Sequence, residues 1–400
     1  MSSMKKINYF QRIFIVLALV GNIIGCQSSK SISTSDTSGA AAAGLTGSMQ
    51  SFKEALTKLL PLVLDLNQFN SKSNRDKIDS NVASLVEISK QVVHSPVANR
   101  LDPSLRFISN AFSDDLRRAQ ESLVLGKRDY ARYTLMNVTA YCIECHTRTS
   151  SGPSFNTPEL EKTVGELRKM ERGEFLLATR QFDRAFLEFE NVIKENISSG
   201  GNLFELDRAV RYALSISIKY QKDPKKSLEV SKIIENFERA PYYLKQSARQ
   251  WSIAIQDWKK EKNQTSGKPE EILKRCEALV RAGKTAQVGF SDRGGDVYFL
   301  RALSDLHQIL ALDLKKDNLG EALYLTGVSY DAVRDLSIWS LHEDYFESCV
   351  RQVPHTKWSD KCYSKLEESL YFGYTGSSGV KLPIDVQLKL NELQKLAMPE

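Results

Sequence analysis

Hydrophobic and polar residues alternate with the period of an α-helix along most of the chain beyond residue 48. Four such stretches follow one another in the segment 48–155, each with apolar residues three, four or seven positions apart. Pro103 suits the first turn of the third stretch and Gly126 suits its end. The apolar faces consist of Phe52, Leu56, Leu59 and Val63; of Ile78, Val82, Leu85 and Val92; of Ile108, Phe112, Leu116, Ala119 and Leu123; and of Ala131, Leu135, Val138 and Cys142. Four amphipathic helices with short connections predict an up-down-up-down bundle.

The segment 157–400 consists of further helical stretches in consecutive pairs. Two places carry small and aromatic residues at similar positions around a turn. They are Ala178-x-Arg180-x-Phe182-x-x-Ala185-x-x-x-Phe189 and Leu325-x-Gly327-x-x-Tyr330, the latter followed by Pro354. Helices are also expected near 204–221, 224–238, 242–260, 269–283 and 296–314. Small residues let helices approach closely, and aromatic residues fill the groove of the neighbouring pair.

These two places resemble the tetratricopeptide repeat, although their spacing departs from its period of about 34 residues. The resemblance implies an α-solenoid of degenerate tetratricopeptide-like helix pairs, whose surface would hold a protein partner. A nonrepetitive helical bundle is the alternative. The expected fold is all-α: a four-helix bundle over 48–155, followed by a helical repeat domain over 157–400.

Composition agrees with a globular helical protein. Hydrophobic residues make up 42% of the chain and charged residues 26%. The chain contains 21 Gly and 11 Pro among 400 residues, too few for an all-β fold rich in tight turns. A net charge of +6 is small for a nucleic-acid-binding protein of this length, so no nucleic acid is expected as a partner.

The first 25 residues have the features of a bacterial secretory signal. Lys5, Lys6 and Arg12 precede the apolar run Ile13–Ile24, which is too short to span a bilayer. The run ends in Ile23-Ile24-Gly25-Cys26, which resembles a lipoprotein lipobox. This resemblance implies removal of 1–25 and a lipid anchor on Cys26. An ordinary signal peptide with a chance cysteine is the alternative.

Residues 26–47 are mostly Ser, Thr, Ala and Gly, a composition that predicts a flexible tether. Gln27 follows the cysteine in place of the aspartate associated with inner-membrane retention in enteric bacteria. The expected location is therefore the periplasm, with the protein anchored to the envelope, in the outer membrane.

A short motif near the end of the fourth helical stretch indicates a cofactor. Cys142-Ile143-Glu144-Cys145-His146 has the Cys-x-x-Cys-His spacing that attaches c-type haem. On a helix, positions 142, 145 and 146 lie on one side. Cys142 and Cys145 are thus expected to form thioether bonds to one haem c, and His146 to be the proximal ligand of its iron.

Three other readings of the motif are weaker. A structural zinc site needs a fourth ligand, and none stands at zinc-finger spacing. A redox Cys-x-x-Cys pair is expected in a βαβ context. A structural disulfide would leave His146 without a role. Export favours haem c, because this cofactor is attached outside the cytoplasm.

Four helices with this motif near the end of the last one resemble the class II cytochromes c, the cytochrome c-prime family. The resemblance covers 48–150 and is specific only at 142–146. The segment 147–153 departs from the family, because it ends the helix quickly where the family continues with a basic or aromatic turn. For the second axial position, family analogy favours Met49 at the start of helix 1. His94 at the end of helix 2 and an iron without a second protein ligand remain alternatives.

The remaining candidate residues carry little chemistry. Cys349 and Cys362 flank a turn between two predicted helices and are expected to form a disulfide in an exported protein. Cys276 is expected to be a buried apolar residue. His307, His342 and His355 form no motif and are expected to be structural or surface residues, and no chemistry is assigned to the loop 291–296. Ser-His-Asp order, a Walker loop and HExxH are all missing from the sequence, so an enzyme is not expected, although haem-dependent oxidoreductase activity stays open.

The expected function is one-electron transfer by a membrane-anchored monohaem cytochrome that meets a redox partner protein. Two other classes stay open. An open iron would bind or sense a small gas such as NO or CO. A haem-free lipoprotein would use the repeat domain to support an assembly of the envelope.

Overall fold

The computed structural model describes residues 36–93, 103–146, 158–261, 267–289, 292–333, 340–377 and 379–398. The protein is all-α, and 83% of the described residues are helical. In this part of the chain the strands are limited to β1 (Thr375–Gly376) and β2 (Gly379–Val380), which form a small antiparallel hairpin. The predicted all-α class is confirmed. The predicted signal peptide, Cys26 and His94 lie outside the described residues.

The four helical stretches predicted in 48–155 are present. They are α1 (Asp36–Leu64), α3 (Arg75–Val93), α5 (Pro103–Val124) and α6 (Arg128–His146). Each packs against the next, and α2 (Leu66–Asn70) with the 3-10 turn η1 (Lys72–Asn74) connects α1 to α3. Because α1 begins at Asp36, residues 36–47 of the expected tether are helical.

The rest of the described chain is a succession of shorter helices. They are α7 (Pro158–Glu166), α8 (Lys169–Ala178), α9 (Phe182–Ser199), α10 (Leu203–Ser215), the π-helix η2 (Ile216–Tyr220), α11 (Pro224–Asn236), α12 (Tyr242–Lys260), α13 (Pro269–Ala286), α14 (Asp296–Leu310), α15 (Lys316–Ala332), α16 (Leu341–Gln352), α17 (Lys357–Gly373) and α18 (Ile384–Ala397). The tightest contacts join neighbours in sequence, as in α8–α9, α11–α12, α13–α14 and α15–α16. This sequential pair packing is consistent with a helical repeat.

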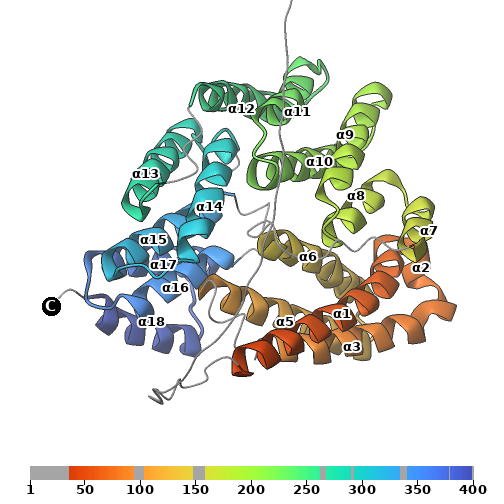
Figure 1. The fold of residues 1–400 in the computed structure, drawn as a ribbon, viewed down its shortest axis with the longest axis horizontal. Coiled ribbons are helices and arrows are strands. Elements are labelled where there is room, and N and C mark those ends of the chain that lie inside the picture. Colours follow the sequence, from red (N-terminus) through yellow and green to blue (C-terminus); the bar gives the residue numbers. More distant parts are fainter. Residues whose placement is uncertain are drawn as a thin grey trace, which may run out of the picture.

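The helices that follow the first four curve around and return to them. Figure 1 shows α7 and α8 beside the first four helices and α16–α18 beside the beginning of α5, with α6 reaching towards the middle of the view. The return is made by Phe107 of α5, whose ring centroid lies 4.8 Å from that of Tyr345 on α16 in an edge-on contact. One cluster of buried apolar residues accordingly extends from Leu56 to Ala397. A second cluster, between Ala55 and Val138, belongs to the first helices alone.

No helix in the described ranges is long and apolar enough to cross a bilayer.

Candidate functional site

The Cys-x-x-Cys-His motif forms the last turns of α6, the helix that reaches the middle of the molecule. The helix starts just after Gly126, whose φ of 72° suits a residue without a side chain. Leu135 and Val138 are buried in the core of the first helices. With 3.6 residues per turn, positions 142, 145 and 146 continue the same side of the helix. Their side chains are outside the described part of the structure, so the backbone of α6 alone places the motif.

Glu144, between the two cysteines in sequence, occupies a position close to the opposite side of α6 and is only 3% exposed. Its carboxylate accepts hydrogen bonds from Lys219 Nζ at 3.1 Å (Oε1) and 3.0 Å (Oε2). The hydroxyl of Tyr330 donates a further, short bond to Oε2. Tyr330 also lies within hydrogen-bond distance of His307, with 3.0 Å between its oxygen and Nε2. Side chains from η2, α14 and α15 thus meet at the end of α6.

All four members of this polar cluster are buried, Lys219 being 2% exposed and Tyr330 1%. Burial of two charges is costly unless they face each other and their remaining hydrogen-bonding groups are satisfied. Here the ammonium group faces both oxygens of Glu144 and lies 5.9 Å from the centroid of the Tyr330 ring. The ring of Tyr330 is in turn stacked on that of Tyr345, with 5.3 Å between centroids. Glu144 is therefore held by a compensated buried cluster.

A row of aromatic residues connects α6 to α5 and α1 at the residue immediately before the motif. The hydroxyl of Tyr141 donates to Asp115 Oδ2 at 2.6 Å, and burial together with this bond raises the pKa of Tyr141 far above its usual value. The ring of Phe112 lies 5.6 Å from that of Tyr141 and 5.4 Å from that of Phe52. These contacts place Tyr141 and Phe52 at the same level of the first four helices.

Met49 is half-buried on α1, close to one turn before Phe52. The opposite end of α1 is tied to the beginning of α6 by Arg132, whose Nε donates to the carbonyl of Val63 (2.8 Å) and whose Nη2 donates to that of Leu64 (2.7 Å). The two helices are therefore antiparallel, and Met49 and the motif lie at the same end of them.

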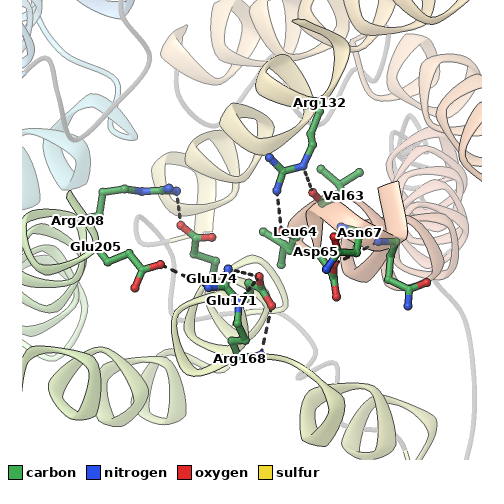
Figure 2. A network of polar contacts seen from close by, with 11 residues as sticks. Val63, Leu64, Asp65, Asn67, Arg132, Arg168, Glu171, Glu174, Glu205 and Arg208 are labelled. Carbon is green, nitrogen blue, oxygen red and sulfur yellow. Dashed lines mark hydrogen bonds and ion pairs between the residues drawn. The ribbon is translucent and has the colours of Figure 1, made fainter. Parts of the chain in front are cut away.

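A second polar network, close to Arg132, joins the first repeat-like helices (Figure 2). Arg168, at the start of α8, pairs with Glu171 at 2.5 Å and with Glu205 of α10 at 3.7 Å. Glu174 is fully buried and forms a short ion pair with Arg208. Burial raises the pKa of Glu174, whereas Arg208 opposes that rise. This network joins α8 to α10.

The other cysteines and histidines named from the sequence are placed as follows. A disulfide joins Cys349 on α16 to Cys362 on α17, with 2.14 Å between the sulfur atoms. Cys276 is a buried free cysteine, and burial raises the pKa of its thiol. His342 is buried with Nε2 2.7 Å from Ser369 Oγ.

Sequence reasoning missed both polar networks. The partners of Glu144 stand 75 and 186 residues further along the chain, and nothing local marks them. The one usable signal is Lys219, which lies among apolar residues in Ile216-Ser217-Ile218-Lys219-Tyr220. Such a surrounding predicts burial of the lysine and hence a buried acidic partner.

Over the described ranges, no cluster of three His, Cys, Asp or Glu side chains is arranged to hold a metal ion. No family model, no curated protein and no solved structure matches the chain.

Proposed function

We propose that the protein is a monohaem c-type cytochrome that transfers one electron at a time. The observation that carries this proposal is the position of Cys142-x-x-Cys145-His146 at the end of a long helix with a buried side. Cys142 and Cys145 would attach the haem covalently, and His146 would supply the proximal ligand. Bound there, the haem would supply a one-electron redox centre.

The surroundings of the motif fit such a group. Position 144, on the side of α6 away from the Cys and His positions, is bound to η2 and α15 through Lys219 and Tyr330. The side that carries positions 142, 145 and 146 continues the apolar side formed by Leu135 and Val138. Lys219 and Tyr330 fix one side of α6, and the other side is apolar and directed to the neighbouring helices. A helix with these two properties is a suitable support for a flat apolar cofactor.

Two versions of this function would differ in whether the protein supplies a second ligand to the iron. Met49 lies at the same end of α1 and α6 as the motif, which supports a Met–iron bond and a simple electron carrier. Phe52 and Phe112 form an aromatic pair near this end, which supports the alternative of an open iron that binds NO or CO.

The anchor and the partners belong to the same proposal. A lipid on Cys26 would attach the protein to the envelope, with the folded part in the periplasm and the anchor in the outer membrane. The helical repeat would then present its surface to a protein partner, and a redox partner would exchange electrons with the haem. Sequential helix pairs, which offer extended surfaces, support the scaffold role.

Covalent attachment is the property to test first. The full chain is produced in the bacterial periplasm together with the haem attachment machinery, boiled in denaturant and stained for haem-linked peroxidase activity on a gel. We expect stain at the mass of the chain, and loss of stain in the Cys142→Ala/Cys145→Ala variant. Cys276→Ala is the matched control, since it removes a cysteine outside the motif. Stain that persists in the double variant, or an unstained wild type, would contradict the proposal. The second result would favour the haem-free envelope lipoprotein.

A further inference from the structure

The ion pair between Lys219 and Glu144, together with the hydrogen bond from Tyr330, joins the motif turn to the repeat region. Lys219 is part of η2, the π-helix that interrupts the regular course of α10 towards α11. π-helical segments insert an extra residue into a helix and often occur at functional sites. The ammonium group of Lys219 binds the carboxylate of Glu144, which lies 75 positions earlier inside the Cys-x-x-Cys-His sequence. The contact is bidentate and buried on both sides.

We propose that Lys219 is a positioning residue that fixes the motif turn of α6 by binding Glu144, an inference that rests on the proposed function. Glu144 lies two positions after the first cysteine and one before the second, so a contact that anchors its carboxylate restrains the backbone that carries both. Tyr330 donates to one oxygen of Glu144, whereas Lys219 contacts both. The repeat region is thereby part of the support of the redox centre as well as a surface for partners.

A second ion pair, with an equally buried carboxylate but a partly exposed cation, provides a comparison. Arg208 and Glu174 join α10 to α8 and include no residue of α6. Glu174 is 3% exposed, the same fraction as Glu144. Loss of the cation from either pair leaves a buried carboxylate without its main partner, so both changes destabilise the fold. Only the change at Lys219 acts on the motif turn.

The test compares Lys219→Met with Arg208→Met in the full-length protein after haem attachment. Three properties are measured: the melting temperature, the rate of amide hydrogen exchange in 141–146, and the midpoint reduction potential. We expect both variants to melt at lower temperature. We expect Lys219→Met alone to accelerate exchange in 141–146 by tenfold or more and to shift the potential. Lys219→Arg, which keeps a cation at this position, should restore both properties.

Two outcomes would overturn the inference. One is wild-type exchange in 141–146 and a wild-type potential in Lys219→Met. The other is an equal change of both in Arg208→Met, which would show a general effect of lost stability. If Lys219→Met does not fold, Glu144→Gln/Lys219→Met removes both charges together, and the same comparison applies to it. A wild type that carries no haem refutes the proposed function, yet exchange in 141–146 still tests the positioning role.

Discussion

Gly173 on α8 lies directly against the ring of Phe189 on α9. A Cβ built on this glycine would be 2.6 Å from Phe189 Cε1, well inside van der Waals contact. The same relationship recurs in the pairs α13–α14 and α15–α16. A Cβ built on Gly283 would be 2.8 Å from Phe299 Cζ, and a Cβ built on Gly327 would be 2.5 Å from Phe346 Cε1. Three helix pairs thus use one packing device, a glycine on the first helix and a phenylalanine on the second.

Substitution of Gly173 by Ala should destabilise the protein. The added methyl group cannot be accommodated without displacement of a fully buried ring, and such overpacking typically costs about 1–3 kcal/mol. Gly165→Ala on α7 is the control, because a Cβ there meets nothing within 4 Å and alanine favours a helix by up to about 1 kcal/mol over glycine. Denaturant unfolding of both variants gives the comparison. Equal midpoints for the two would contradict the packing argument.

The disulfide between Cys349 and Cys362 should stabilise the last helix pairs. The bond closes a loop with a sequence separation of 13, for which the loss of chain entropy in the unfolded state corresponds to about 3 kcal/mol. Cys349→Ala/Cys362→Ala should therefore lower the free energy of unfolding by a similar amount. A reductant should destabilise the wild type and leave the double variant unchanged. If reductant affects both alike, the stabilisation comes from another source.

The stability of the fold should decrease as pH rises from about 4 to about 6. Burial raises the pKa of Asp296 from its ordinary 3.8 to about 6, although Arg293 and Arg211 oppose the rise. In this range the folded state holds a proton that the unfolded state has released, so its advantage is lost as pH increases. The change from this group is at most about 3 kcal/mol. It is opposite in direction to that of a salt-bridged carboxylate with a lowered pKa.

Asp296→Asn should reduce this pH dependence, as measured by denaturant midpoints between pH 4 and 7. Asp344, whose pKa burial raises to about 7, produces a decrease in the same direction, so part of the slope should remain. Asp257→Asn on the exposed side of α12 is the matched control and should keep the whole slope. A slope of wild-type size in Asp296→Asn would refute the assignment.

The helices were predictable because their apolar faces repeat with the helical period. Ile78, Val82 and Leu85, which mark one predicted face, are all fully buried on α3. The expected turn between Ala178 and Phe182 is present, with Arg180 in the left-handed region at φ 62°. The glycine–phenylalanine relationship could also have been found, since Phe189 and Phe299 each follow their glycine by sixteen positions. Local patterns therefore accounted for these helices and for the turn between α8 and α9.

The polar clusters were not predictable in this way. Glu144 and Lys219 are charged residues, whose ordinary place is the surface, and their burial depends on a partner brought close only by the complete curve of the chain. The same holds for Glu174 of α8, whose buried charge is compensated by Arg208 of α10. The hairpin β1–β2 carries no alternating pattern, because each of its strands has two exposed residues.

The lipid anchor at Cys26 is tested by fractionation. Cys26→Ser should release the protein from membranes, or leave it at the mass of the uncleaved precursor, because the thiol that takes the lipid is absent. The wild type should partition into detergent and carry the mass of added acyl chains, which together hold a protein firmly since each buried methylene contributes about 0.8 kcal/mol. Unchanged fractionation and unchanged mass in the variant would exclude the lipoprotein assignment.

Met49 should decide whether the iron is open. The antiparallel arrangement of α1 and α6 brings Met49 to the end where the motif lies, so its thioether is the side chain expected to reach the far side of the iron. A Met–iron bond gives a weak near-infrared charge-transfer band in the ferric protein. Met49→Ala should abolish this band and increase the affinity of the ferrous form for CO, because the sixth position is then vacant.

Leu62→Ala, in the same helix but near its other end, is the control and should keep both properties. A wild type without the band that already binds CO readily would exclude Met49 as a ligand and favour gas binding over simple electron transfer. If His94→Ala changes the spectrum and Met49→Ala does not, the ligand is His94, and a lower reduction potential should accompany it.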